Sequence, residues 1–157
     1  MIYEISRYQG SRDHDIAALI LSIQNDEAKL SLTVADQPDL LDVVASYRKG
    51  GFWIAEHEGK IVGTIGLLPH GERAALKKFF VAIEHRGPDG PARGLFDELL
   101  RTARGRRYQD IFLDTPSVAT RSHAFYRKVG FQKCELEDLP PDYAFPDRNS
   151  LVFRRSI

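Results

Sequence analysis

The sequence has one cysteine, Cys134, and no apolar run long enough to span a membrane. A single thiol excludes an internal disulfide and any metal site built from several cysteines, and it favours a reducing compartment. The apolar stretch at residues 16–23 is much shorter than the roughly 20 residues that cross a bilayer. The first residues also lack the basic and then apolar pattern of a signal peptide. We therefore expect a cytoplasmic protein without a membrane partner.

The sequence also lacks a net charge. Lysine plus arginine equals aspartate plus glutamate at 22 each, so no overall field directs the chain toward nucleic acid. The arginines at 101, 104, 106 and 107 lie at the C-terminal end of a predicted helix, where cations complement the helix dipole. The histidines lie apart without metal-ligand spacing. We expect no nucleic-acid partner and no bound metal.

What the chain does have is enough apolar sequence for one core. It contains 157 residues, of which 43% are hydrophobic, and no interdomain linker or internal repeat is visible. We predict a single domain over residues 1–157.

The first third of the chain is predicted to be mainly helical, after a short opening strand at residues 2–5. The apolar spacing at residues 16–23 predicts a helix with Ser11 or Asp13 as its N-cap. A second helix is expected from Pro38, with Asp36 as its cap.

The pattern then becomes strand-like. Residues 52–57 and 60–68 flank Glu58-Gly59 and predict a β-hairpin, followed by a third antiparallel strand at residues 73–81. A helix over residues 95–103, a strand at 111–113, a helix through Tyr126 and two terminal strands at 131–135 and 150–153 complete the order. This order predicts an α/β (α+β) domain on one mixed sheet.

The most informative segment is the one that joins the strand at 73–81 to the helix at 95–103. Its loop contains Arg86, Gly87, Gly90 and Pro91 and passes directly into the helix. Backbone N–H groups in such a loop, together with the unpaired donors of the first helical turn, form a binding site for a diphosphate. The glycines permit positive φ and close backbone approach. Taken alone, the same loop is also compatible with an ordinary turn.

The loop resembles the acetyl-CoA loop of the GNAT superfamily, Arg/Gln-x-x-Gly-x-Gly/Ala after a strand ending in valine. Val81, Arg86, Gly90 and Ala92 match this pattern, with one extra residue because Asp89 stands where the first loop glycine is expected. A second match lies at residues 122–131, Ser-His-Ala-Phe-Tyr-Arg-Lys-Val-Gly-Phe, which is similar to the family's Ala-x-x-Phe-Tyr-x-x-x-Gly-Phe signature.

The resemblance implies a GNAT-like mixed, mostly antiparallel sheet of about seven strands that is splayed in the middle and flanked by about four helices. It also implies acetyl-coenzyme A as co-substrate and transfer of an acetyl group to a primary amine. The catalytic roles fall on Tyr126, as proton donor to the thiolate, and on the N–H of Val81, as donor to the thioester oxygen. The implied cofactor-binding residues are Phe79, Phe80, Val81, Arg86, Gly87, Pro88, Asp89, Gly90, Pro91, Ala92, Thr115, Ser117 and Tyr126.

The sequence departs from the family pattern at two positions. Ala75 stands where relatives often have a glutamate base, and Ala119 stands where they often have an asparagine. The general base is therefore left unassigned, with Glu56, His70 and Glu72 as alternatives. These departures also leave a second function open, a non-catalytic coenzyme A-binding sensor or interaction module.

The acceptor amine is not identified by the sequence. Asp142, Tyr143 and Asp147 lie in a proline-rich segment that would border the acceptor entrance and receive a cationic amine. The chain is expected to be a monomer or a homodimer, with residues 150–153 as an exposed edge strand through which two copies could pair.

Overall fold

Seven strands form one sheet in the order β1-β2-β3-β4-β5-β7-β6 in the computed structural model, which describes residues 2–144 and 149–157. The strands are β1 (Glu4–Arg7), β2 (Gly51–His57), β3 (Lys60–His70), β4 (Arg73–Val81), β5 (Asp110–Pro116), β6 (Gln132–Cys134) and β7 (Ser150–Ser156). The helices are α1 (Asp13–Ser22), α2 (Val43–Ser46), α3 (Ala92–Gly105) and α4 (Thr120–Lys128). The predicted mixed sheet with about four helices is confirmed.

Five short helical turns complete the described chain. They are the π-helical turn η1 (Ile23–Glu27) and the 3-10 turns η2 (Val34–Asp36), η3 (Pro38–Leu40), η4 (Ile83–His85) and η5 (Leu136–Asp138).

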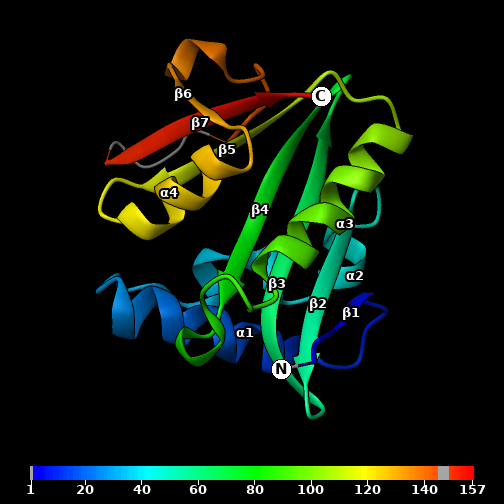
Figure 1. Ribbon diagram of the computed structural model, residues 1–157, viewed down its shortest axis with the longest axis vertical. Helices are drawn as coiled ribbons and strands as arrows, with labels where there is room; N and C mark the ends of the chain where they lie inside the picture. Colours follow the sequence, from blue (N-terminus) through cyan, green and yellow to red (C-terminus); the bar gives the residue numbers. More distant parts are fainter. Residues whose placement is uncertain (1, 145–148) are drawn as a thin grey trace.

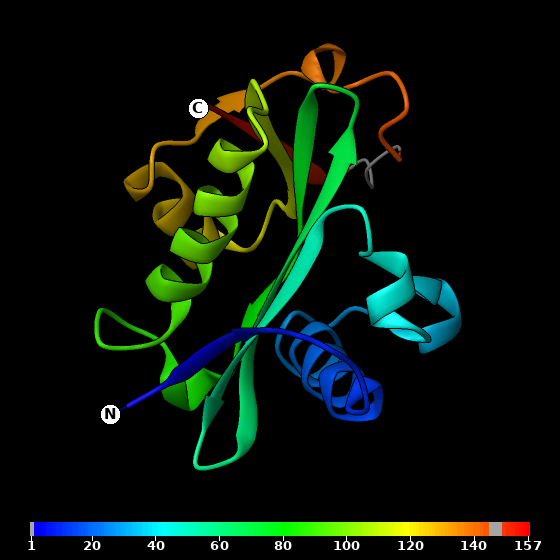
Figure 2. The ribbon, with the colours of Figure 1, turned by 90° about the vertical axis from the view of Figure 1, so that its right-hand side faces the viewer.

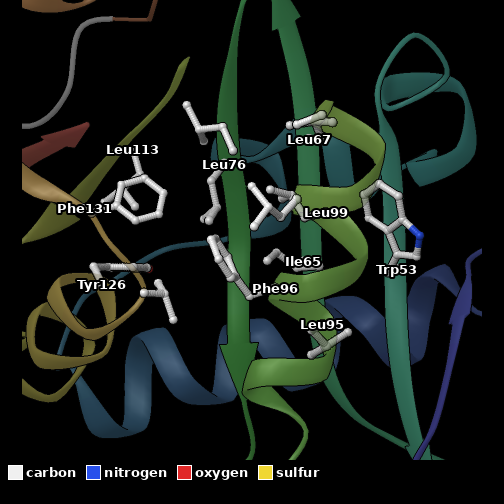
Figure 3. Packing of buried hydrophobic residues seen from close by; sticks show 14 of the residues in the cluster. Trp53, Ile65, Leu67, Leu76, Leu95, Phe96, Leu99, Leu113, Tyr126 and Phe131 are labelled. Carbon is white, nitrogen blue, oxygen red and sulfur yellow. The ribbon is translucent and has the colours of Figure 1, made fainter. Parts of the chain in front are cut away.

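Helices cover both faces of the sheet, as Figure 2 shows. On one face, α3 and α4 pack on a core that includes Leu95, Phe96 and Phe131 (Figure 3). On the other face, α1 and the turns before α2 pack on a second core around Ile16 and Tyr47. The two cores explain the apolar runs of β2 and β3, because strands covered on both faces have no solvent-facing side.

The helix starts differ from the predicted caps. Neither Ser11 nor Asp13 caps α1; its N-cap is Arg12, whose N–H donates to the Tyr8 hydroxyl at 2.7 Å. The predicted second helix is broken into η3 and α2, and Asp42, rather than Asp36, caps α2 by accepting from Ala45 N–H. These starts are set by tertiary contacts and turn geometry that residue type alone does not reveal.

The edge-strand expectation for residues 150–153 is wrong. β7 lies between β5 and β6, and it pairs with β5 along its full length, from Asp110↔Ser156 to Pro116↔Ser150. The edges of the sheet are β1 and β6. A β7 edge is therefore not available for pairing between two copies.

β4 carries a β-bulge in its centre. Its register with β3 shifts between Thr64↔Phe80 and Gly66↔Lys77, so one extra residue lies on β4. Lys78, in the bulge, has φ +50, a left-handed conformation that side chains other than glycine seldom adopt. The buried Thr64 hydroxyl donates to the Lys78 carbonyl at 2.7 Å and supplies that carbonyl with a partner.

β4 and β5 then separate. They are the parallel pair of the sheet and are joined at two positions, Ala74↔Ile111 and Ala75↔Phe112. Beyond these positions β4 continues to Val81 and β5 to Pro116 without pairing with each other. Figure 1 shows β5 and β7 slanting away from β4. We call this region, β4 after Ala75 and β5 after Phe112, the β4–β5 divergence. The splayed centre implied by the GNAT resemblance is confirmed.

Within the described residues, no helix has both the length and the apolar character needed to cross a membrane.

Replacing Thr64 with valine tests the bulge. Thr64→Val keeps the side-chain shape and leaves the Lys78 carbonyl without its hydroxyl partner, so we expect the free energy of unfolding to fall by about 1–3 kcal/mol in urea denaturation. Thr64→Ser, which keeps the hydroxyl and loses a methyl group, is the control. A valine variant that is at least as stable as the serine variant would show that this hydrogen bond does not hold the bulge.

Candidate functional site

The main-chain N–H of Val81 faces the β4–β5 divergence. Gly63 is opposite Val81 in the antiparallel β3–β4 ladder, and the next pair along is joined by a hydrogen bond from Ala82 N–H to Val62 O of 2.8 Å. Because hydrogen-bonded and non-hydrogen-bonded pairs alternate in such ladders, Gly63 and Val81 form a non-hydrogen-bonded pair. The Val81 amide therefore points away from β3, toward the side that β5 has left.

The loop after β4 provides further backbone donors. Gly87 has φ +108, and a turn is closed by Gly90 N–H donating to Gly87 O at 3.0 Å. Gly90 does not have the positive φ that was expected; it is required because a Cβ there would lie 2.0 Å from the His85 carbonyl oxygen. The loop leads into α3, whose first turn has neither a side-chain cap nor an acidic residue. Its N–H groups are thus left for an anion.

Tyr126 of α4 lies on the other side of the divergence. Its ring packs in an aromatic cluster. The ring centroid lies 5.8 Å from that of Phe131 (Figure 3) and 6.2 Å from that of Phe79 of β4. The residue is 6% exposed, and its hydroxyl makes no hydrogen bond to any described residue. Burial raises the pKa of Tyr126 above its ordinary value, and the nearby Asp114 carboxylate raises it further. The phenol is therefore protonated at neutral pH and is a hydrogen-bond donor.

The site thus combines three features: a strand gap with a backbone donor, a glycine loop that opens a helix, and a protonated phenol. The model of the acetyltransferase (GNAT) family matches residues 18–131 of the chain. The chain belongs to the GNAT family.

Solved structures and curated relatives agree with this assignment. An acetyltransferase from Streptococcus agalactiae is 38% identical with a TM-score of 0.93, and the match covers 99% of this chain and 98% of that one. The N-acetyltransferase 8B of Rattus norvegicus is 38% identical over 104 residues, which are 60% of this chain and 46% of that protein. The match thus spans about half the length of this curated relative.

The GNAT fold is also shared by a protein solved with coenzyme A. An N-acetylglutamate synthase from Neisseria gonorrhoeae, complexed with coenzyme A and N-acetylglutamate, is 23% identical with a TM-score of 0.74, covering 99% of this chain and 35% of that one. The family resemblance and the fold class are confirmed, and acetyl-coenzyme A is the co-substrate that the family assignment supports.

Arg86, a predicted cofactor-binding residue, contacts two other parts of the chain. Its guanidinium forms a bidentate ion pair with Glu27 of η1, at 2.7 and 3.0 Å, and its Nε donates to the Val81 carbonyl at 2.9 Å. In this GNAT domain, the arginine therefore fastens the loop after β4 to η1 and to the end of β4. The Val81 carbonyl is thus already an acceptor within the chain.

The remaining predicted cofactor residues are divided between the two ends of the site. Gly87, Pro88 and Asp89 are exposed at the tip of the loop, and Pro91 and Ala92 begin α3. Thr115 is buried within the β5–β7 ladder, and Ser117 is exposed in the turn before α4. Phe79 faces α4, whereas Phe80 packs on the opposite core.

Ala119, which stands where relatives often have an asparagine, is the N-cap of α4, and its side chain makes no capping hydrogen bond. His123, one turn into α4, is buried, and its Nε2 lies 2.9 Å from the Pro116 carbonyl oxygen. This contact joins the end of β5 to α4 by a different side chain, which the sequence pattern did not indicate.

The three alternatives for the base each have a partner, and His70 also stacks on the Tyr143 ring, with centroids 5.4 Å apart. Glu56 pairs with Arg12 at 2.7 Å beside β1, and Glu72, in the β3–β4 turn, accepts from Gln109 at 2.8 Å. His70 is 3.0 Å from the exposed Asp142. Among the described residues, no group of three or more histidine, cysteine, aspartate or glutamate side chains is arranged to hold a metal ion.

Gly87→Ala tests the loop. The substitution should weaken acetyl-coenzyme A binding by at least tenfold in calorimetry, because alanine disfavours the positive φ on which the amide arrangement depends. Gly71→Ala is the matched control, since Gly71 also has positive φ and an empty surrounding but lies in the β3–β4 turn. Equal affinity of the two variants would separate the loop from cofactor binding.

Glu27→Gln tests the ion pair with Arg86. It removes a carboxylate near the expected diphosphate and frees a guanidinium for it, so we expect acetyl-coenzyme A to bind about 3- to 10-fold more tightly. Glu98→Gln, which removes the exposed partner of Arg101, is the control. Weaker binding in Glu27→Gln would instead show that the pair is needed to shape the loop.

Proposed function

We propose that this chain transfers an acetyl group from acetyl-coenzyme A to a primary amine of a small molecule or peptide, by direct attack within a ternary complex. The observation that carries this proposal is the Val81 N–H, which points into the β4–β5 divergence between the glycine loop and Tyr126. A thioester oxygen placed there accepts a hydrogen bond that strengthens as negative charge develops on it, an effect of about 3–4 kcal/mol in comparable sites.

Backbone groups support the proposed position of both ends of the co-substrate. The diphosphate fits the backbone N–H groups of Gly87, Asp89 and Ala92 and the positive end of the α3 dipole, without a metal ion. Pro88 and Pro91 have no N–H, and that of Gly90 is used within the loop. The pantetheine arm fits along the unpaired side of β4, as an added strand does. This leaves the thioester near Val81 and Tyr126.

The reaction balances without a further reactant. The ammonium of the acceptor first loses one proton to water, and the neutral nitrogen attacks the thioester carbon to form the C–N bond. The C–S bond breaks as the thiolate takes a proton from Tyr126, and the second amine proton restores the phenol through water. The products are the N-acetylated amine, coenzyme A and one released proton.

A covalent route through Cys134 is not supported. Burial and the nearby Asp138 raise the pKa of this thiol to about 11, so little thiolate is present at neutral pH. Direct attack is the simpler route for this site.

We also infer that residues 1–157 act as one domain, because all seven described strands belong to one sheet. The cytoplasmic location, and the choice between monomer and homodimer, stay predictions.

Tyr126→Phe tests the proposal. We expect kcat for release of coenzyme A to fall by about 10²- to 10⁴-fold, because the thiolate loses its proton donor. The affinity for acetyl-coenzyme A should change less than threefold. Tyr108→Phe is the control.

Acetyl-coenzyme A binding and a panel of amines give the decisive outcomes. Absence of binding at millimolar acetyl-coenzyme A would end the proposal. Binding without turnover of any amine would favour the non-catalytic sensor.

A further inference from the structure

Two lysine–aspartate pairs lie on the face of the sheet opposite α3 and α4, where β4 and β5 begin to separate. The first pair, Lys77 and Asp114, is two residues beyond the last paired positions of the two strands, with Nζ and Oδ1 3.6 Å apart. The Tyr143 hydroxyl donates to the same Asp114 oxygen at 2.5 Å. Lys77 lies over the Tyr143 ring, with Nζ 4.3 Å from its centroid.

The second pair is Lys78 and Asp39, with Nζ and Oδ2 3.6 Å apart. Asp39 belongs to η3, and it also accepts a hydrogen bond of 2.7 Å from the buried Tyr47 hydroxyl. Lys78 is the residue at the β-bulge with φ +50. We call these four residues the lysine–aspartate cluster: Asp39, Lys77, Lys78 and Asp114.

The cluster is partly withdrawn from water. Its four side chains are 18–28% exposed, and desolvation by burial lowers the pKa of Lys78 although Asp39 opposes the shift. The partial burial of four charges lowers the stability of the fold, and so does the left-handed conformation of Lys78. Destabilising features of this kind are concentrated at functional sites.

The hydrogen bonding within the cluster is uneven. Each carboxylate accepts a short hydrogen bond from a tyrosine, at 2.5 and 2.7 Å. Each ammonium stands 3.6 Å from its carboxylate, beyond the usual 2.7–3.2 Å of a hydrogen bond, and Lys77 Nζ also donates to the Tyr143 hydroxyl at 3.3 Å. The two ammonium groups are adjacent in sequence and repel one another. An added anion would offset this repulsion and give each ammonium a further acceptor.

The cluster also borders the proposed reaction centre. The Asp114 carboxylate raises the pKa of Tyr126, on the α4 side, and of Tyr143, on the cluster side. Asp114 is therefore close to both phenols, and it lies on β5 beyond its last pair with β4. A thioester beside Tyr126 would be open to an acceptor that approaches from the cluster.

We propose that the lysine–aspartate cluster is the acceptor site and that the acceptor is a small molecule with a carboxylate next to its primary amine, as in an amino acid. Lys77 and Lys78 hold the carboxylate, and Asp114 faces the amine. A polyamine or aminoglycoside would bring further positive charge against the two lysines. This inference rests on the proposed acetyl transfer and adds the substrate class to it.

The first experiment compares acceptors with and without the carboxylate. Each of the twenty amino acids, the amide of every amino acid that reacts, and a set of carboxylate-free amines are assayed for release of coenzyme A. We expect kcat/KM for at least one amino acid to exceed that of its amide at least tenfold.

The second experiment removes the lysine charges from the full chain. Lys77→Gln, and Lys78→Asn, chosen because asparagine tolerates a left-handed backbone, should each raise KM for the amino acid at least tenfold. The rate with its amide and the affinity for acetyl-coenzyme A should change less than threefold. Lys60→Gln, at the exposed start of β3, is the control.

The outcomes separate this inference from the function on which it rests. If acetyl-coenzyme A binds and carboxylate-free amines react as well as amino acids, the acceptor class is wrong and acetyl transfer stands. An equal loss on the acid and the amide in both lysine variants would also overturn it. If acetyl-coenzyme A neither binds nor turns over with any amine, the function itself fails.

Discussion

The hydrogen bond between the Thr64 hydroxyl and the Lys78 carbonyl lies at the centre of the architecture. It stabilises an extra residue in β4, and this residue changes the direction of the strand just after its two pairs with β5. A regular β4 would continue to pair with β5, and the Val81 amide would then be used within the sheet. The site therefore depends on a local irregularity that one buried side chain maintains.

The divergence also joins the two faces of the sheet. Elsewhere the strands separate the core beneath α3 and α4 from the core beneath α1 and α2. Between β4 and β5 this barrier is interrupted, so that Tyr126 from one side and Asp114 from the other are close enough to influence each other electrostatically. In the proposed reaction, the two reactants would meet at this interruption from opposite faces of the sheet.

The sequence predicts the architecture well where the signal is local. The Glu58-Gly59 hairpin and the 73–81 strand follow from alternation and turn chemistry, and their strands are found at nearly the predicted bounds. The predicted caps of α1 and α2 were wrong because Tyr8 and Asp42 act through turn geometry, which residue type does not specify. The interior position of β7 depends on strand order, a long-range property.

The candidate site divides in the same way. The glycine loop and Tyr126 can be found from motifs, whereas Glu27 lies 59 residues from Arg86 and carries no signal of pairing with it. Asp39 and Lys78 come together only through folding, and the left-handed backbone of Lys78 is not indicated by its residue type. The two departures at Ala75 and Ala119 show where a family pattern is incomplete without showing what replaces it.

The attachment of Arg86 has a mechanical consequence for the segment before η2. This single guanidinium joins η1 to the end of β4, so a phosphate that attracted it would detach η1 and leave the segment to the reciprocal amide pair of Gln24 and Gln37. By thermodynamic reciprocity, whatever rigidifies η1 against the loop would disfavour the phosphate by the same free energy. The mobility of residues 23–33, on the far side of the sheet, would thus report whether a phosphate is bound at the loop after β4.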